Sequence, residues 1–279
     1  MAKKKPIKKK TVLDADLPKG YLSPSQLEMY MRCPRQYMYR YIEGEKRPPG
    51  VALVEGSSHH EALHKNNAHK IKKGKDLKEK TVVEAFCDKF NDNSKEIDSL
   101  GWGTETVDSV IDRGKLLLNR YMEDFADLLK PQLAEQELTF PVAGIPFLGY
   151  VDVFGYLRGR TNTRERQAII DYKVVARKKS EWELNNSVQL TYYGMALTHL
   201  TKVRSPTAGF CCLKKTKKPE VEWQPTMITP ARVKWFKFVA TETAKAIKKG
   251  SFPPCDPTSW CCCEKFCGFF DICKDKVCS

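Results

Sequence analysis

The stretch that decides the fold reads Gly149-Tyr-Val-Asp152, followed by Ile169-Ile-Asp171-Tyr-Lys173. Each short apolar run delivers a carboxylate, and the second run adds a lysine two residues later. Because residues i and i+2 of a strand point to the same face, Asp171 and Lys173 are expected side by side, with Asp152 beside them from a neighbouring strand. Two carboxylates can hold a divalent metal, and an adjacent ammonium can position a water molecule or an oxyanion. This layout suits cleavage of a phosphodiester bond.

The composition indicates a globular protein with a polyanionic partner. Of the 279 residues, 41% are hydrophobic and 29% are charged, which is ordinary for a soluble domain. The formal charge is +14, and six lysines within residues 1–10 contribute to it. No apolar run approaches the roughly 20 residues of a membrane span, and the lysine-rich start lacks the apolar core of a signal peptide. We therefore expect a cytoplasmic protein (in the host cytoplasm, if a phage encodes it) that does not bind membranes.

Periodicity along the chain predicts helices, then a short sheet, then helices again. Residues 1–20 form a basic, low-complexity tail that we expect to be disordered. Helical signals lie at residues 23–41, 51–73, 76–98, 106–130, 185–200 and 229–249. Strand signals lie at residues 136–140, 147–157, 167–175, 207–213 and 220–225. This order predicts an α/β fold, with a mixed central β-sheet flanked by helices and a helical insertion at about 61–130.

Cysteine is distributed unevenly. Seven of the eleven cysteines lie between Cys255 and Cys278, after the pair Pro253-Pro254. Without a signal peptide, this crowding is poor evidence for disulfides and better evidence for a metal or iron–sulfur site. We expect residues 255–279 to form a small satellite that packs with the helix bearing Cys33.

Six short motifs follow one another along the chain. They are Leu22-Ser-Pro-Ser-Gln-Leu, Arg32-Cys-Pro-Arg-Gln-Tyr, Gly56-Ser-Ser-His-His60, Gly149-Tyr-Val-Asp152, Asp171-Tyr-Lys173 and Gln189-Leu-Thr-Tyr-Tyr193. Over residues 21 to 273 the chain resembles the PD-(D/E)XK nuclease superfamily, specifically its branch of RecB-like and CRISPR-associated exonucleases. Each motif alone is weak, whereas six in order are strong. The resemblance implies a restriction-endonuclease-like nuclease domain over residues 21–254.

The resemblance also implies roles for the residues of the opening stretch. Asp152 and Asp171 would be metal-binding carboxylates for Mg²⁺ or Mn²⁺, and the backbone carbonyl of Tyr172 would complete the site. Lys173 would orient or activate the attacking water and offset charge on the phosphorane. His60 aligns with a helical histidine that this branch adds as a further metal ligand.

Two further features bear on this site. Gln189 and Tyr193 match the Gln-x-x-x-Tyr helix of the family, and as i and i+4 they share a helix face that is expected to touch the scissile region or the lysine. Position 171 carries Asp where many relatives have Glu, and both are accepted in the superfamily. Glu135 or Glu137 could add a carboxylate, and the sequence leaves open whether one or two metals bind.

A second constellation involves the cysteines. In the CRISPR-associated and AddB-like nucleases, one early and three late cysteines hold a [4Fe–4S] cluster that staples the two chain ends together. That pattern resembles Cys33, Cys262, Cys267 and Cys273. Cys261 and Cys263 are alternatives to Cys262, and Zn²⁺ is the competing occupant because it also accepts four thiolates.

The predicted function is therefore that of a metal-dependent DNA exonuclease, acting on single-stranded or end-bearing DNA in replication, recombination or repair. The alternatives are a non-catalytic DNA-binding or recombination accessory module and an RNA-directed nuclease. A helicase or recombination partner and a homo-oligomer are compatible with the sequence. The alternating tyrosines and arginines of residues 30–41, the basic loops 177–179 and 214–218, and Trp182 either contact DNA or serve only packing and solvation.

Overall fold

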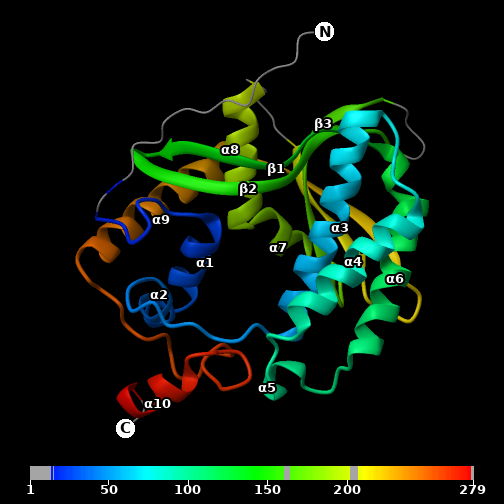
Figure 1. The fold of residues 1–279 in the computed structure, drawn as a ribbon. Coiled ribbons are helices and arrows are strands. Elements are labelled where there is room, and N and C mark those ends of the chain that lie inside the picture. Colours follow the sequence, from blue (N-terminus) through cyan, green and yellow to red (C-terminus); the bar gives the residue numbers. More distant parts are fainter. Residues whose placement is uncertain (1–13, 15, 160–163, 202–206, 278–279) are drawn as a thin grey trace. The chain divides into compact units, whose positions relative to one another are not determined.

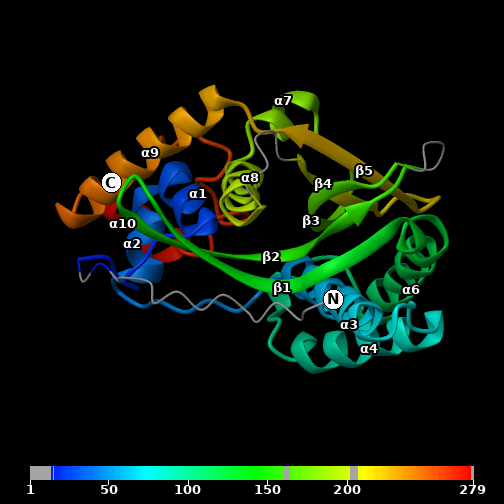
Figure 2. The same cartoon turned by 90° about the horizontal axis from the view of Figure 1, so that it is seen from above.

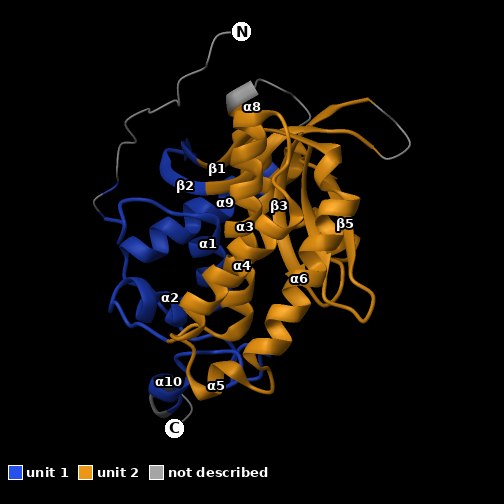
Figure 3. Cartoon of the chain, turned by 45° about the vertical axis from the view of Figure 1, so that its right-hand side comes forward, with its two compact units in different colours: residues 1–47, 137–149, 233–279 blue, residues 48–136, 150–232 orange. Residues whose placement is uncertain are grey.

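A computed structural model describes residues 14, 16–159, 164–201 and 207–277 (Figure 1). Most of the predicted basic tail, and Cys278, lie outside the described residues. The chain divides into two compact units, coloured separately in Figure 3. Unit 1 comprises residues 1–47, 137–149 and 233–279, and unit 2 comprises residues 48–136 and 150–232.

Unit 2 begins with a group of helices. The helix α3 (Val51–Lys73) has the bounds that the sequence predicts, and it ends at Gly74, whose φ of 75° is the left-handed conformation that glycine adopts without steric cost. The helices that follow are α4 (Glu79–Ser94), α5 (Ser99–Trp102), α6 (Val107–Asp124) and the short 3-10 helix η1 (Ala126–Leu128). None of the described helices is both long and apolar enough to cross a membrane.

A five-stranded sheet follows, with the strand order β1-β2-β3-β4-β5. The strands are β1 (Leu129–Val142), β2 (Ile145–Leu157), β3 (Arg166–Val175), β4 (Thr207–Lys214) and β5 (Glu220–Met227). The pairs β2–β3 and β4–β5 are antiparallel, whereas β3–β4 is parallel. A parallel pair needs a crossover, which α7 (Glu181–Asn185) and α8 (Val188–Thr201) provide. The mixed sheet flanked by helices confirms the predicted α/β fold.

Helices cover both faces of the sheet in unit 2. Figure 2 shows α3, α4 and α6 on one side of β3, β4 and β5, with α7 and α8 on the other. On the first side, Phe86 and Tyr121 from the helices pack with Ile170 and Tyr172 of β3 in one buried core. Because side chains alternate along a strand, burying Ile170 and Tyr172 on this face sends the intervening Asp171 to the other face.

Unit 1 contains the chain's first and last helices. They are α1 (Pro24–Arg32), α2 (Pro34–Tyr41), most of α9 (Pro230–Lys248) and α10 (Phe270–Val277). Ser23 caps α1 by accepting a hydrogen bond from the backbone N–H of Gln26 at 3.2 Å. Within the same unit, the ring of Phe147 on β2 contacts that of Phe236 on α9.

The alternating tyrosines of α1 and α2 serve packing. Tyr37 and Tyr39 are buried, and the rings of Tyr30 and Phe252 contact Tyr37 from outside the α2 helix. The Tyr30 hydroxyl donates a hydrogen bond to the carbonyl of Ser251 at 2.6 Å. Of the two interpretations of this segment, packing within unit 1 is therefore the one that the contacts support.

The boundary between helices and sheet differs from the prediction. The helix expected to reach residue 130 ends at Asp124, and Pro131 lies inside β1 instead of closing a helix. Proline has no backbone N–H to donate to a neighbouring strand. It is tolerated here because β1 is the edge strand of the sheet. The terminal helix α10 has no counterpart among the predicted elements.

Two helical glycines test the packing of unit 2. A Cβ atom on Gly114 of α6 would lie 2.2 Å from ring atoms of the buried Phe86, whereas a Cβ on Gly56 of α3 would meet no atom within 4 Å. We expect Gly114→Ala to lower the free energy of unfolding by about 1–3 kcal/mol through overpacking. The control Gly56→Ala should leave it unchanged or raise it by up to about 1 kcal/mol. Urea denaturation of both variants measures this, and equal effects would contradict the close packing of α4 against α6.

Candidate active site

The pairing between β2 and β3 stops beside the predicted site. The last residue pair of the antiparallel ladder is Val153 with Ile170, and Asp152 comes next on β2. There, Oδ2 of Asp152 accepts a hydrogen bond at 2.7 Å from the backbone N–H of Tyr172. A side-chain oxygen thus satisfies a main-chain donor where the ladder ends, and the carboxylate is fixed beside β3.

Asp171 and Lys173 lie side by side on β3, as the alternation predicts. Nζ of Lys173 is 2.6 Å from Oδ2 of Asp171, whose side chain is only 1% exposed, whereas that of Lys173 is 29% exposed. The same ammonium lies over the ring of Phe210 on β4, 5.4 Å from its centroid. The ion pair compensates the buried carboxylate, and the ring packs against the cation.

The helix α8 contributes an amide and a phenol to the same place. Nε2 of Gln189 donates to Oδ1 of Asp171 at 2.7 Å and to the hydroxyl oxygen of Tyr193 at 3.0 Å. The Tyr193 hydroxyl in turn donates to the backbone carbonyl of Tyr150 on β2 at 2.6 Å. The predicted Gln-x-x-x-Tyr pair therefore reaches the site, where it bonds to the carboxylate of Asp171 and to β2.

The two neighbouring histidines of α3 have different environments. Nδ1 of His60 lies 3.1 Å from Oδ1 of Asp152, so this side chain joins the carboxylates. His59 is fully buried, and its Nδ1 donates to the carbonyl of Glu55 at 2.8 Å. Burial lowers the pKa of His59 to about 4, which keeps it neutral. Successive residues of a helix point about 100° apart, which separates the site histidine from the core histidine.

Burial and neighbouring charges shift the pKa values of the site residues. Burial raises the pKa of Asp171, and the charge of Asp152 raises it further, although Lys173 opposes both. Burial lowers the pKa of His60, but the hydrogen bond to Asp152 and the charge of Asp171 outweigh it, so that the pKa is raised. The shift of Asp171 is thus mainly a cost of burial, whereas that of His60 reflects the two carboxylates beside the imidazole.

The donor set of the site fits Mg²⁺ or Mn²⁺ by its chemistry. Two carboxylates are the hard oxygen ligands that these ions prefer, and an imidazole also suits Mn²⁺. Within the described part of the chain, however, no three His, Cys, Asp or Glu side chains converge in an arrangement that could hold a metal ion. The carboxylate oxygens are bonded to Tyr172, Gln189, Lys173 and His60 instead.

A buried carboxylate on α3 was missed by the sequence reasoning. Glu55 is 1% exposed, and Arg113 of α6 donates to both of its oxygens at 2.8 and 3.1 Å. Lys215, which follows β4, lies 3.2 Å from the same group. Burial alone would raise the pKa of Glu55, but these two cations outweigh it and leave the pKa lowered. The sequence did contain a signal for this group, because Glu55 lies four residues before His59 and therefore on the same face of the predicted helix.

The cysteines of unit 1 gather around Cys33. Sγ of Cys255 lies 3.9 Å from Sγ of Cys261, and Cys255 also shares a hydrogen-bond contact with Cys33. Burial raises the pKa of Cys267 and of Cys273, and the charge of Cys33 adds to both shifts. The cysteines among the described residues are free thiols, and they do not form a ready-made metal site.

Acids compensate the first basic loop fully and the second only in part. Arg177 and Lys179 pair with Glu183, and Lys178 pairs with Glu222. In the second loop, the cations with acidic partners are Lys214 (Glu220 and Glu222) and Lys215 (Glu55). Trp182 is highly exposed and therefore does not anchor its loop.

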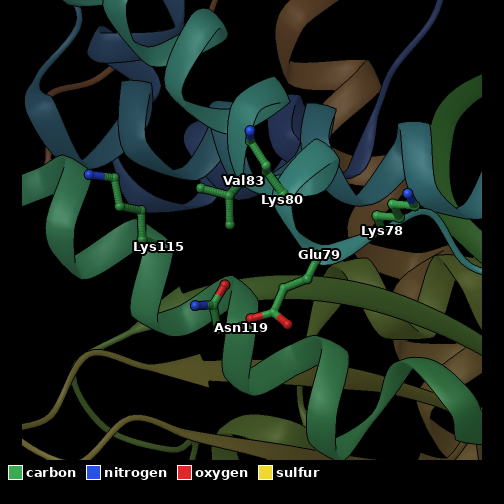
Figure 4. A pocket seen from close by; sticks show the side chains of 6 residues that line it. All are labelled: Lys78, Glu79, Lys80, Val83, Lys115 and Asn119. Carbon is green, nitrogen blue, oxygen red and sulfur yellow. The ribbon is translucent and has the colours of Figure 1, made fainter.

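A depression of about 520 Å³ lies elsewhere in unit 2 and contains none of the predicted site residues (Figure 4). It is lined by Lys78, Glu79, Lys80, Val83, Lys115 and Asn119. In Figure 4 the side chains of Lys78, Lys80 and Lys115 extend in different directions. The lysines do not converge on a single point, so the depression has no preformed anion site.

Comparison with known proteins identifies the family. The family described as the PD-(D/E)XK nuclease superfamily matches residues 21–274. The chain belongs to the PD-(D/E)XK nuclease superfamily. A crystal structure of a "Putative exonuclease" from Eubacterium rectale is similar to this PD-(D/E)XK protein with a TM-score of 0.56 at 15% sequence identity, over 87% of this chain and 86% of that one. At this identity the likeness concerns the fold. No match is found among curated protein sequences.

The ion pairs of Glu55 give a prediction about stability in this PD-(D/E)XK protein. Glu55→Ala leaves Arg113 and Lys215 without their buried partner and should lower the free energy of unfolding by about 3 kcal/mol. The matched control is Glu84→Ala, which removes an exposed pair with Lys80 and should change it by less than about 0.5 kcal/mol. Guanidinium denaturation of both variants measures the difference. Equal losses would contradict the buried network.

Proposed function

We propose that this PD-(D/E)XK protein is a metal-dependent DNA exonuclease of the RecB-like and CRISPR-associated branch. It acts on single-stranded or end-bearing DNA in replication, recombination or repair. One observation carries the proposal: the buried Asp171 and the half-buried Lys173 share one face of β3, with Asp152 held against the same strand by a hydrogen bond to its backbone. A binding module has no need for this set of side chains.

The residues that would hold Mg²⁺ or Mn²⁺ are Asp152, Asp171, the backbone carbonyl of Tyr172 and His60. The proposal is supported by the raised pKa of Asp171, since a cation would compensate the charge that burial and Asp152 make unfavourable. When bound, a divalent cation lowers the pKa of a water molecule and stabilises negative charge on the phosphoryl oxygens. Glu135 or Glu137 remains a proposed additional carboxylate.

Lys173 acts on the attacking water in this proposal. Its side chain is 29% exposed, whereas that of its partner Asp171 is 1% exposed, so Lys173 lies on the solvent side of the pair. There it orients the nucleophile and offsets the charge that develops on the phosphorane. Gln189 is a positioning residue, because its amide holds Oδ1 of Asp171 and leaves Oδ2 to Lys173.

We also propose that Cys33, Cys262, Cys267 and Cys273 hold a [4Fe–4S] cluster that staples the ends of the chain within unit 1. The support is the resemblance of the cysteine spacing and the gathering of thiols around Cys33. Four thiolates can hold such a cluster or Zn²⁺.

Cleavage assays test the catalytic proposal. Lys173→Ala and Asp171→Ala should each reduce Mg²⁺- or Mn²⁺-dependent degradation of DNA by at least about 100-fold, because each removes a group that acts on the transition state. Lys178→Ala removes a nearby surface lysine that pairs with Glu222, and it should retain activity as the matched control. The substrates are 5′- and 3′-labelled single- and double-stranded DNA, with RNA for comparison, in Mg²⁺, Mn²⁺ or EDTA.

Folding of each variant is checked by circular dichroism. Wild-type rates in folded Lys173→Ala and Asp171→Ala proteins would reject the assignment of the site. Binding of DNA in EDTA without any cleavage in Mn²⁺ would indicate an accessory module instead. Preferential degradation of the RNA substrate would show that the nuclease is directed to RNA.

The cluster proposal has a spectroscopic test. Anaerobically purified protein should show a broad absorbance band at roughly 400 nm that bleaches with dithionite. Cys262→Ser should lose most of this band, whereas Cys87→Ser, which lies in unit 2, should keep it. A colourless protein that contains zinc would contradict the iron–sulfur assignment. Loss of the band in Cys261→Ser or Cys263→Ser, but not in Cys262→Ser, would move the ligand to that cysteine.

A further inference from the structure

The helix α9 carries an aromatic and basic face within unit 1. Trp235 and Phe238 are 40% and 65% exposed, and Lys234 and Lys237 beside them are exposed as well. Phe236, between them in the sequence, is fully buried in the interior of the unit. The side chains on either side of the buried ring thus form a surface of two cations and two large rings within about one helical turn.

The structure gives these four side chains no polar or aromatic partner among the residues that it describes. Among the described residues, none of them makes an ion pair, a side-chain hydrogen bond or a ring contact. The lysines nearer the end of α9 differ, because Lys245 pairs with Glu242 and Lys248 pairs with Asp14. The positive charge of Lys234 and Lys237 and the exposed rings of Trp235 and Phe238 are therefore not paired with other side chains in the described part of the chain.

The first half of α9 carries positive charge only. Residues 230–241 contain three cations and no acid, and the first turn has no acidic residue. Lys234 and Lys237 are three residues apart and therefore neighbours on the helix surface, where like charges repel. Exposed tryptophan and phenylalanine rings add an unfavourable contact with water. A polyanion with flat apolar surfaces would offset both costs.

We propose that the face of α9 formed by Lys234, Trp235, Lys237 and Phe238 binds single-stranded nucleic acid. The bases stack on Trp235 and Phe238, which are neighbours on the helix surface at i and i+3, and the phosphates pair with the two lysines. A single strand exposes the faces of its bases, whereas a duplex covers them by stacking and pairing. The nature of the polyanion rests on the proposed nuclease function.

An anionic membrane is the other polyanionic surface to consider. A helix that lies in a membrane interface needs a continuous apolar face turned to the lipid. The continuous apolar face of α9, which includes Phe236, Ala240 and Ala244, is buried within unit 1 instead. The exposed face has two rings set among lysines, which suits alternating bases and phosphates better.

Binding experiments in EDTA test the proposal without cleavage. The probes are a fluorescent 20-nucleotide oligothymidine and a duplex of the same length. The double variant Trp235→Ala/Phe238→Ala should bind the single strand about tenfold or more weakly and change duplex binding little. Lys234→Gln/Lys237→Gln should weaken both and reduce the salt dependence of single-strand binding, while Lys234→Arg/Lys237→Arg should restore it. Leu100→Ala/Leu116→Ala, at two other exposed apolar positions, should behave as the wild type.

The outcomes separate this inference from the proposed function. Unchanged single-strand affinity in a folded Trp235→Ala/Phe238→Ala protein overturns the inference. If this variant also loses the binding to phosphatidylglycerol vesicles that the wild type shows, the face binds a membrane instead. In Mn²⁺, the variant should raise KM for a long single strand and leave kcat within about twofold. A wild-type protein that binds the strand through this face but cuts no DNA would reject the nuclease function and leave the binding surface established.

Discussion

The buried carboxylate of Asp171 is the constraint around which unit 2 is arranged. An unpaired carboxylate in the interior costs several kcal/mol, so its partners must be in place when the chain is folded. Lys173 pairs with one of its oxygens from the same strand, and Gln189 donates to the other from α8. The side chains that stabilise the folded state are therefore also those that define the candidate site.

The strand β3 serves the core and the site at the same time. Its alternation buries Ile170 and Tyr172 against α3, α4 and α6 and turns Asp171 to the opposite face. The helix α3 also serves both the core and the site, because successive residues of a helix point in different directions. His59 is buried in the core, whereas His60 contacts Asp152. The buried pairs of Glu55 fix the first turns of this helix and thereby the position of the histidine that follows.

Local patterns predicted much of this arrangement. The i, i+2 spacing of Asp171 and Lys173 and the i, i+4 spacing of Gln189 and Tyr193 each determine a shared face, and both pairs lie where expected. The end of α6 could not be predicted in this way, because Pro131 reads as a helix terminator and its tolerance depends on the edge position of β1. Long-range pairs such as Glu55 with Lys215 depend on how elements pack and leave no local pattern. For the same reason, the contact between Cys33 and Cys255 could not be predicted from the spacing of the cysteines.

The central claim is that Asp152 and Asp171 form one cation site on adjacent strands. Titration of the protein with Mn²⁺, followed by electron paramagnetic resonance of the free ion, measures this directly and does not depend on turnover. The account predicts that Asp152→Asn and Asp171→Asn each weaken Mn²⁺ binding strongly, while Glu183→Gln, a carboxylate outside the site, binds as the wild type does. Equal Mn²⁺ affinity in all four proteins would contradict it.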